Sequence, residues 1–386
     1  MGHYLDYAAT SAIRPQAVVD AVSDFLQACG ATPGRGGHSR AVDAERIAFR
    51  CRRSLMAVLG LTGDPGRIAF MQNATHALNT ALSGLLSTGD PVVVTAYDHN
   101  AVLRPVHYLE RSRGVVVRMV SGTPEGELDF TEVDRLLDGA KLLVVNAASN
   151  VLGTALPLSA LAARAHAAGA LVLVDAAQSA GHLPGSPAEG GADLVAFTGH
   201  KGLLGPQGTG GLWVREGLEI GPLLVGGTGG DSSQRDMPAD MPDRLEAGTT
   251  NAPGLAGLLA GCRFVLDEGI EAIHAREAAL KARLREGLTS IGGLRVLSPP
   301  APEGVGVVTV ASDELDPGTL SERLDRDFDV STRPGLHCAP EAHRLIGTLE
   351  TGALRFSLGW ASTDVDVDRA VEGVDRILRR PAVPVS

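Results

Sequence analysis

Two charged side chains, each directly after an apolar strand-like run, have the types and spacing expected of a cofactor site. Asp175 ends the run LVLVD, and Lys201 follows the run LVAF in the glycine-flanked turn TGHKG. A carboxylate at the end of a buried strand needs a cation, because an unpaired buried charge is costly. A desolvated lysine is a nucleophile for an aldehyde. The pair predicts pyridoxal 5'-phosphate (PLP), with its protonated ring nitrogen at Asp175 and its aldehyde on Lys201 as a Schiff base.

Each member of this pair also has an ordinary interpretation when it is taken alone. Asp175 is as consistent with a helix N-cap, and Lys201 with an exposed loop lysine. Thr198 precedes the lysine, and its hydroxyl together with nearby backbone N–H groups suits a phosphate. The combination of the two strand ends in one sheet favours the cofactor.

A possible nucleophile lies in the turn RPGLHCAP, near the C-terminal end of the chain. Cys338 follows His337 and lies close to Arg333, and such an electropositive loop favours the thiolate, which is the reactive form. The alternative is a small buried hydrophobic residue. That alternative is the favoured interpretation of the other three cysteines, Cys29, Cys51 and Cys262.

Further candidates follow strands or lie in polar loops. His99 comes after the run PVVVT, and a functional role there is favoured over a structural one. Arg355 is a single cation on the apolar run ALRFSLGW, which favours binding of an anionic ligand over a surface position. Arg35 and His38, in the loop PGRGGHSR, are as consistent with the rim of a site as with a solvated loop.

The elements that must position these residues form an α/β pattern. Between Ile68 and Val214, short β-branched runs alternate with helical stretches such as Thr75–Leu86 and Leu158–Ala168. The pattern predicts a mostly parallel sheet that is covered on both faces and binds ligands at the carboxyl ends of its strands. The runs interpreted as buried strands are RIAF, PVVVTA, GVVVRMV, KLLVVNA, ALVLVDAA, DLVAFT and GGLWV.

The remaining chain predicts a second, smaller unit. A Gly-, Pro- and Asp-rich stretch at 225–250 indicates a long functional loop. Helical patterns follow at 254–269, 273–291 and 365–379, and strand patterns at 305–310 and 353–358. A length of 386 residues exceeds what one core supports, so two domains are expected. The large one spans 14–250, and the small one spans 251–386 together with 1–13.

Charge and cysteine usage limit the classes of binding partner that the sequence predicts. The net charge of −11 argues against nucleic acid or an anionic membrane as the main partner. The cysteines form no CxxC pair, so neither a metal site nor a disulfide framework is expected. This cysteine usage makes a reducing cytoplasm the expected location. No signal peptide or membrane-spanning run is evident.

Together these strings resemble the cysteine desulfurase and selenocysteine lyase family, in the class V aminotransferase group of fold type I PLP enzymes. The resemblance runs from YLDYAAT near the start to RFSLGWAST near the end. VDAAQ followed by TGHK is a specific pairing, and RxGxHCAP is more specific still. Three departures are Ala74, where many relatives have a second Thr, Asp98, where Glu is commoner, and an extra residue after Lys201 in GHKGLLGP.

The resemblance implies roles for the matching residues. Lys201 would bind PLP and shuttle protons, Cys338 would attack the substrate sulfur, and His99 would stack on the ring and exchange protons. Thr249 would reach the phosphate of the neighbouring subunit, which implies a homodimer. The implied cofactor-binding residues are Thr75, His76, His99, Asn150, Asp175, Gln178, Thr198, His200, Lys201 and Thr249. With the loop candidates above, the substrate-binding residues are Arg355, Asn150, Arg333, Arg35 and His38.

The activity that the resemblance implies is a PLP-dependent cysteine desulfurase. It would convert L-cysteine to L-alanine, hold the sulfur on Cys338 as a persulfide and pass it to an acceptor protein or a small thiol. Other interpretations stay open. A selenocysteine lyase would use the same site with L-selenocysteine, and a PLP-dependent C–S lyase, epimerase or aminotransferase-like enzyme of specialised metabolism would leave Cys338 incidental. The chain could also be an inactive scaffold that binds a sulfur-transfer partner.

Overall fold

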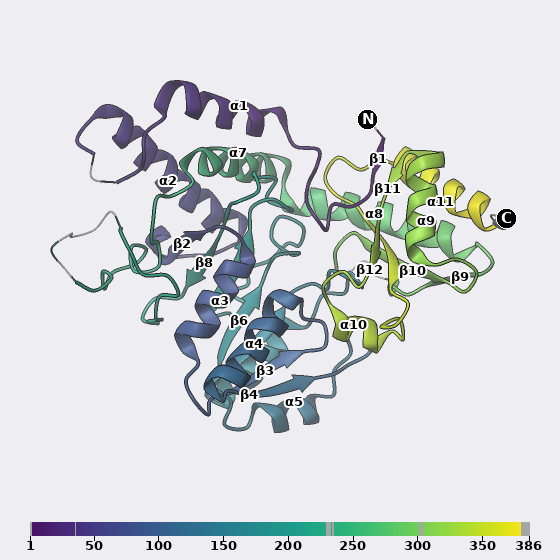
Figure 1. Cartoon of the computed structure of the whole chain (residues 1–386), viewed down its shortest axis with the longest axis horizontal. Helices are drawn as coiled ribbons and strands as arrows, with labels where there is room; N and C mark the ends of the chain where they lie inside the picture. Colours follow the sequence, from purple (N-terminus) through teal and green to yellow (C-terminus); the bar gives the residue numbers. More distant parts are fainter. Residues whose placement is uncertain (1, 35, 229–232, 234, 301–303, 380–386) are drawn as a thin grey trace.

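A seven-stranded sheet forms the centre of the protein, whose computed structural model describes residues 2–34, 36–228, 233, 235–300 and 304–379. Figure 1 shows this sheet in the larger part of the molecule. The strand order is β2-β8-β7-β6-β5-β3-β4, and every neighbouring pair is parallel except the two that involve β8. The predicted α/β class with a mostly parallel sheet is confirmed. The strands are β2 (Ile68–Met71), β3 (Pro91–Thr95), β4 (Val116–Val120), β5 (Leu142–Asn146), β6 (Leu171–Asp175), β7 (Leu194–Thr198) and β8 (Gly210–Val214).

The central strands are apolar throughout because both faces of the sheet are buried. Successive side chains alternate between the faces. On β5, for example, Leu143 and Val145 belong to one hydrophobic cluster, and Leu142 and Val144 to another. The polar residues come last: Asn146 and Asp175 are register partners at the carboxyl ends of β5 and β6. The sheet thus delivers its polar side chains to one edge, as a parallel arrangement requires.

Helices cover the two faces of the sheet. On one face lie α3 (Ala74–Leu85) and α4 (Asn100–Arg113), whose buried residues join the cluster that contains Leu142. The opposite cluster receives buried residues from helices that are distant in sequence. These are α2 (Ser39–Val58), α5 (Phe130–Leu137), α6 (Leu158–Ala167) and α7 (Ala252–Glu268). At the N-terminal side, α1 (Gln16–Asp24) continues into a π-helical turn, η1 (Phe25–Cys29), and packs against α7.

A second sheet lies in the C-terminal part of the chain, with strand order β12-β13-β10-β9 and antiparallel pairing. The N-terminal strand β1 (His3–Tyr4) pairs in parallel with β11 (Val330–Ser331), and Leu5 joins the C-terminal hydrophobic cluster. Figure 1 shows the N-terminus and the C-terminal helix on the same side of the molecule. The other elements here are α8 (Ile270–Thr289), β9 (Leu294–Val296), β10 (Val307–Ser312), α9 (Pro317–Phe328), β12 (Arg333–Gly335), α10 (Pro340–Leu345), β13 (Ala353–Ser357) and α11 (Asp364–Arg379). A domain division at 250 stays a prediction.

Other expectations can be compared with the described residues. Each of the seven strand-like runs overlaps a strand of the large sheet, and the five predicted helices differ from those observed by a few residues at their ends. The described part of 225–250 contains no helix or strand, as the loop prediction requires. Among the described residues, no helix is long and apolar enough to cross a membrane, and no group of side chains is arranged to hold a metal ion.

A buried ion pair joins the segment after β6 to α8. Nδ1 of His182 lies 2.9 Å from a carboxylate oxygen of Glu277, and the side chains are 9% and 1% exposed. Burial alone would lower the pKa of His182, but the charge of Glu277 and the hydrogen bond to it raise that pKa above its ordinary value. Breaking such a pair leaves an uncompensated buried group, so this contact is expected to stabilise the fold strongly.

We therefore expect Glu277→Gln to lower the free energy of unfolding by about 3 kcal/mol at pH 6. Because the pKa of folded His182 is raised, the stabilisation is complete below the ordinary histidine pKa and is lost as the pH rises through the folded value. The difference between wild type and variant should thus shrink as the pH rises above the ordinary histidine pKa. Urea denaturation at a series of pH values measures it. Glu286→Gln, exposed on the same helix, is the control, and an equal effect of both variants would contradict this assignment.

Candidate active site

A cavity of about 270 Å³ opens at the carboxyl edge of the large sheet, where the C-terminal part of the chain meets it. Its walls come from the strand ends, the start of α3, the start of α4, the N-terminal segment and the turn after β12. Most of the residues singled out in the sequence line it together. These are Thr75, His99, Asn150, Asp175, Gln178, Thr198, His200, Lys201, Arg333, Cys338 and Arg355.

Three of the candidates that the structure describes do not line this cavity. His76 is half-buried on α3, and His38 is exposed at the N-cap of α2, where its ring accepts a hydrogen bond from the backbone of Ala41. Thr249 is exposed and lines a different hollow beside α2. Arg35 lies outside the described residues. In a single chain, therefore, neither the predicted phosphate contact of Thr249 nor a rim position for His38 is formed.

Asp175 and Lys201 face the same cavity from neighbouring strands. Burial raises the pKa of Asp175, although a hydrogen bond from the backbone N–H of Ala177 (2.9 Å) and the charge of Lys201 oppose this. Burial likewise lowers the pKa of Lys201 to about 8, against the opposing charge of Asp175. The carboxylate is thus short of positive charge, and the amine loses its proton readily. These are the properties that a pyridinium partner and a nucleophilic amine need.

The N-terminal segment holds the lysine turn in place. The backbone N–H of Ser11 donates to the carbonyl of His200 (2.9 Å), and its hydroxyl donates to the carbonyl of Lys201 (2.9 Å). The ring of His200 contacts the hydroxyl of Thr10 at 3.1 Å. Burial and the charge of Lys201 lower the pKa of His200 to about 4, so its ring is neutral near pH 7.

One end of the cavity has the features of an anion site. Asn73 caps α3, with its side chain accepting from the backbone of His76 (2.9 Å), and Ala74 and Thr75 of the first turn line the cavity. A helix N-terminus attracts anions through its free N–H groups and its dipole. Gly210 on β8 allows the close approach of this turn, because a Cβ there would lie 2.7 Å from Cα of Asn73. The first turn of α3 is therefore the part of the cavity suited to a phosphate.

His99 caps α4 and presents a neutral ring to the cavity. The backbone N–H of Ala101 donates to its Nδ1 at 3.0 Å, which places the proton of the neutral ring on Nε2. Burial, followed by the charges of Lys201 and Arg355, lowers the pKa of His99 to about 4. The ring is therefore available for stacking or hydrogen bonding without adding charge.

Arg355 is a buried cation on β13. Its Nη2 donates to Asp6 at 2.7 Å, and its Nη1 donates to the carbonyl of Asn150 at 3.1 Å. Asp6 also faces Arg333 at 3.8 Å. Sequence reasoning missed Asp6. It stands in the YLDYAAT string that carried the resemblance, but long-range contacts of the N-terminal segment with β11 and β13 bring it to Arg355.

The turn that carries Cys338 is held by contacts on several sides. Asn150 donates from its side chain to the carbonyl of His337 (2.7 Å), and the backbone N–H of Asn100 donates to the carbonyl of Cys338 (2.6 Å). The ring of His337 contacts His343 at 3.0 Å, and His343 in turn contacts the hydroxyl of Thr348 at 2.7 Å. Cys338 is exposed at the edge of the cavity. Sequence reasoning had not identified His343 as a support of this turn.

The lining suits PLP on grounds independent of any relative. Three buried polar atoms that have no hydrogen-bond partner among the described residues belong to it: Oγ1 of Thr198, Oδ1 of Asn150 and Nε of Arg355. Such unsatisfied atoms are rare in folded proteins and indicate a missing ligand. A carboxylate, an amine and an anion-binding helix turn surround the same space, which matches the charges of an aldehyde cofactor with a ring nitrogen and a phosphate.

Comparison with known proteins gives one consistent family. A family model described as Aminotransferase class-V matches residues 3–370. A probable cysteine desulfurase 2 from Mycobacterium leprae is 34% identical and covers 97% of this chain and 91% of its own. A probable cysteine desulfurase from Methanothermobacter thermautotrophicus is 33% identical, with coverages of 97% and 94%.

Solved structures agree with these relatives. The apo structure of a cysteine desulfurase from Thermococcus onnurineus NA1 matches with a TM-score of 0.91 at 32% identity, covering 97% of this chain and 94% of that one. The cysteine desulfurase CsdA from Escherichia coli, with S-sulfonic acid, matches with a TM-score of 0.88 at 28% identity, with coverages of 98% and 95%. The likeness extends over nearly the whole chain.

The electrostatics of Lys201 can be tested on the protein without cofactor. Its amine should react with formaldehyde and borohydride with a half-maximal rate near pH 8, because burial lowers its pKa to about that value. Asp175→Asn removes a charge that raises this pKa, so the midpoint should move to lower pH. Mass spectrometry of peptides separates Lys201 from the exposed Lys141, which is the internal reference. A midpoint near 10.5, the ordinary lysine value, would contradict the assignment.

Proposed function

The chain belongs to the aminotransferase class-V family, and we propose that it is a PLP-dependent cysteine desulfurase that converts L-cysteine to L-alanine and takes the sulfur onto Cys338. The observation that carries this proposal is the meeting of Asp175, Lys201 and Cys338 at one cavity. The names of the relatives supply the reaction, and the cavity supplies the side chains that it needs. Family membership bears out the resemblance found in the sequence.

The cofactor would be held along the cavity from the sheet edge to α3. Asp175 would pair with the ring nitrogen, and Lys201 would bind the aldehyde carbon. Gln178, whose side-chain nitrogen donates to the carbonyl of Ala8 at 3.0 Å, lies on the same wall and would contact the phenolic oxygen. The phosphate would lie at the first turn of α3, with Thr75 and the unpartnered hydroxyl of Thr198 as donors. Bound there, PLP supplies the electron sink that makes bonds at Cα and Cβ of an amino acid breakable.

The substrate would lie between the cofactor and the Cys338 turn. Arg355 would bind its carboxylate, a task suited to a planar guanidinium, and its Nε–H has no partner among the described residues. Asn150 would contact the same part of the substrate, since its Oδ1 is also unpartnered. Lys201, with a pKa of about 8, would take the proton from Cα and return it.

The nucleophile of the sulfur-transfer step would be the thiolate of Cys338. It would attack the sulfur of L-cysteine, so that an S–S bond forms while the Cβ–S bond breaks. The electron pair of the broken bond stays with Cβ, which takes a proton and becomes the methyl group of L-alanine. Cys338 keeps the sulfur as a persulfide. Its exposure allows an acceptor protein or a small thiol to collect that sulfur afterwards.

The alternative activities differ from a desulfurase in how far they depend on the thiol of Cys338. A C–S lyase or an aminotransferase-like enzyme has no use for a cysteine at the cavity edge, so the position of Cys338 favours desulfuration. A selenocysteine lyase would share the site but depend less on Cys338, because selenide leaves more readily than sulfide. A cytoplasmic location stays a prediction from cysteine usage.

Replacing the nucleophile tests the sulfur step. Cys338→Ala should abolish sulfide release from L-cysteine in the presence of a reductant, and the persulfide mapped by mass spectrometry should disappear with it. Cys29→Ala, at a half-buried cysteine on η1 outside the cavity lining, is the matched control and should retain wild-type turnover. Undiminished turnover by Cys338→Ala would remove the persulfide from the mechanism. Rates on L-selenocysteine, measured in parallel, separate the lyase alternative.

We also propose a homodimer in which Thr249 completes the phosphate site of the other subunit. Thr249 is exposed and does not line the cavity of its own chain, as a residue acting across an interface would require. Thr249→Ala should therefore weaken PLP binding several-fold, measured by equilibrium dialysis, without changing the mass found by light scattering. A PLP-loaded wild-type monomer would contradict this arrangement.

A further inference from the structure

Two like charges lie directly opposite each other at the substrate end of the cavity. Arg333 on β12 and Arg355 on β13 are register partners in the antiparallel pair. Cross-strand partners have Cβ atoms close together, and like charges in such positions are destabilising. The side chain of Arg355 is 3% exposed, whereas that of Arg333 is 46% exposed. A buried guanidinium beside a second cation requires an anion.

Asp6 is the anion that faces both arginines. One carboxylate oxygen accepts from Nη2 of Arg355 at 2.7 Å, and the other lies 3.8 Å from Nη1 of Arg333. No other carboxylate among the described residues forms an ion pair with either arginine. The backbone on both sides of Asp6 is fixed, because Ser357 donates its N–H to the carbonyl of Leu5 (2.7 Å) and its hydroxyl accepts from Ala8 (2.9 Å). Asp6 is therefore held in this position by β13 itself.

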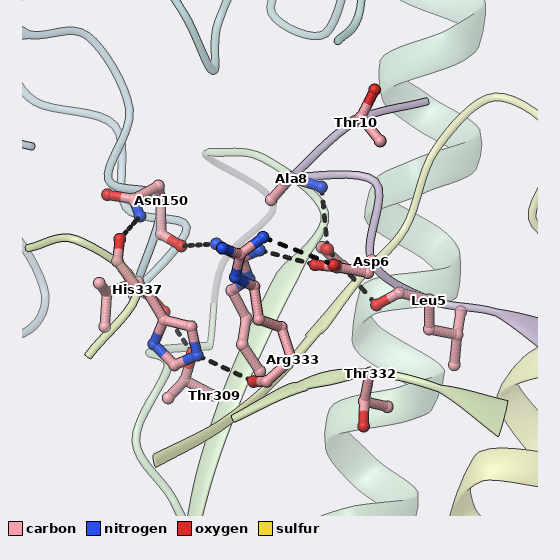
Figure 2. Close-up of polar contacts among 12 residues, drawn as sticks. Leu5, Asp6, Ala8, Thr10, Asn150, Thr309, Thr332, Arg333 and His337 are labelled. Carbon is pink, nitrogen blue, oxygen red and sulfur yellow. Dashed lines mark hydrogen bonds and ion pairs between the residues drawn. The ribbon is translucent and has the colours of Figure 1, made fainter. Parts of the chain in front are cut away.

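The contacts form a closed ring that includes the thiol turn, as Figure 2 shows. From Asp6 the ring passes to Arg355, then to the carbonyl of Asn150. The side chain of Asn150 donates to the carbonyl of His337, whose Nε2 contacts the carbonyl of Arg333 at 2.9 Å. The guanidinium of Arg333 then returns to Asp6. The two arginines thus share the carboxylate of Asp6, and the same ring of contacts holds the turn that carries Cys338.

We propose that Asp6 is a positioning and specificity residue. It orients Arg355, and its negative charge leaves the substrate end of the cavity with enough positive charge to bind one substrate carboxylate but not a second. Two guanidiniums and one carboxylate give this cluster a net charge of one positive. An amino acid with an uncharged side chain brings one negative charge to it. An amino acid with a second carboxylate near Cβ would meet Arg333 already engaged with Asp6, and would be repelled by Asp6.

The neighbouring histidines do not change this balance near pH 7. Burial, then the charge of Arg355, lowers the pKa of His337 to about 3, and burial lowers that of His99 to about 4. Both rings are therefore neutral. Asp175 and Lys201 face the cofactor end, where their charges are matched to each other. Asp6 is the acidic member of the cluster, and the proposed reaction assigns it no step.

The inference rests on the proposed role of Arg355 in binding the substrate carboxylate, and the experiment keeps the two claims apart. The probes are L-alanine and L-aspartate, which carry one and two carboxylates and contain no sulfur. Their dissociation constants are measured on the PLP-loaded enzyme from the change in cofactor absorbance, and thermal unfolding of each variant is recorded without ligand. If Arg355→Gln binds L-alanine as the wild type does, the proposed carboxylate site fails. Loss of L-alanine binding by Arg355→Gln would support the carboxylate site, and the role of Asp6 is then tested by its own variants.

The decisive variant is Asp6→Asn, whose amide oxygen can still accept from Arg355 but carries no charge. Relative to L-alanine, it should bind L-aspartate about tenfold more tightly than the wild type does, because the repelling carboxylate is gone. Arg333→Gln changes the charge in the opposite direction and should increase discrimination against L-aspartate. This second variant alters an exposed side chain, so it tests the proposal even if Asp6→Asn folds poorly.

Asp368→Asn, on α11, removes the same unit of charge at an exposed ion pair with Arg283 of α8 and serves as the control. Its ratio of L-aspartate to L-alanine affinity should equal that of the wild type. A lower melting temperature for Asp6→Asn with an unchanged ratio would overturn the proposal and reduce Asp6 to a structural counter-ion. An unchanged ratio in Arg333→Gln would overturn it as well.

Discussion

The structure depends on one constraint, which is that charges buried at the sheet edge must be matched within the same cavity. Asp175 and Lys201 are each shifted by burial towards their neutral forms, and each opposes the shift of the other. Desolvation is what makes the amine reactive, and the same desolvation makes the carboxylate costly without a cation. A cofactor with a basic ring nitrogen satisfies both groups. The parallel sheet meets this constraint by ending β6 and β7 at one edge, so that apolar strands carry polar residues to a shared space.

The N-terminal segment is the part of the chain that connects the two ends of this site. Ser11 and Thr10 contact the lysine turn, while Asp6 contacts the two arginines and Leu5 belongs to the C-terminal hydrophobic cluster. A short stretch therefore contacts both the turn of Lys201 and the guanidinium of Arg355, the two groups proposed to bind the cofactor and the substrate carboxylate. Its own position depends on parallel pairing of β1 with β11, a contact between opposite ends of the chain. Cofactor and substrate chemistry are thus coupled through an element that contributes little to either hydrophobic core of the large sheet.

Much of this arrangement was predictable because it follows from local patterns. Buried β-branched runs gave the strands, and the polar residues at their ends gave Asp175 and Lys201 without any contact information. Asp6 and His343 were not predictable in the same way. Their roles arise from pairing between segments hundreds of residues apart, or from a ring contact inside a turn whose backbone no local rule specifies. Thr249 lies away from the cavity of its own chain, and its proposed role across an interface came from the resemblance and not from a local pattern.

Backbone strain marks the same site. Among the described residues, four that are not glycine have positive φ, and three of them lie in the two turns that carry the reactive groups: Leu204, His337 and Cys338. A left-handed residue with a side chain costs about 1–2 kcal/mol, and it persists only where surrounding contacts determine it. At Cys338 those contacts are the hydrogen bonds from Asn100 and Asn150 and the histidine pair that ends at Thr348. A glycine would relieve the strain at Cys338 but could not supply a thiol. The strain is therefore a consequence of placing a thiol in a turn tight enough to face the cavity, and the surrounding hydrogen bonds hold the turn in that conformation.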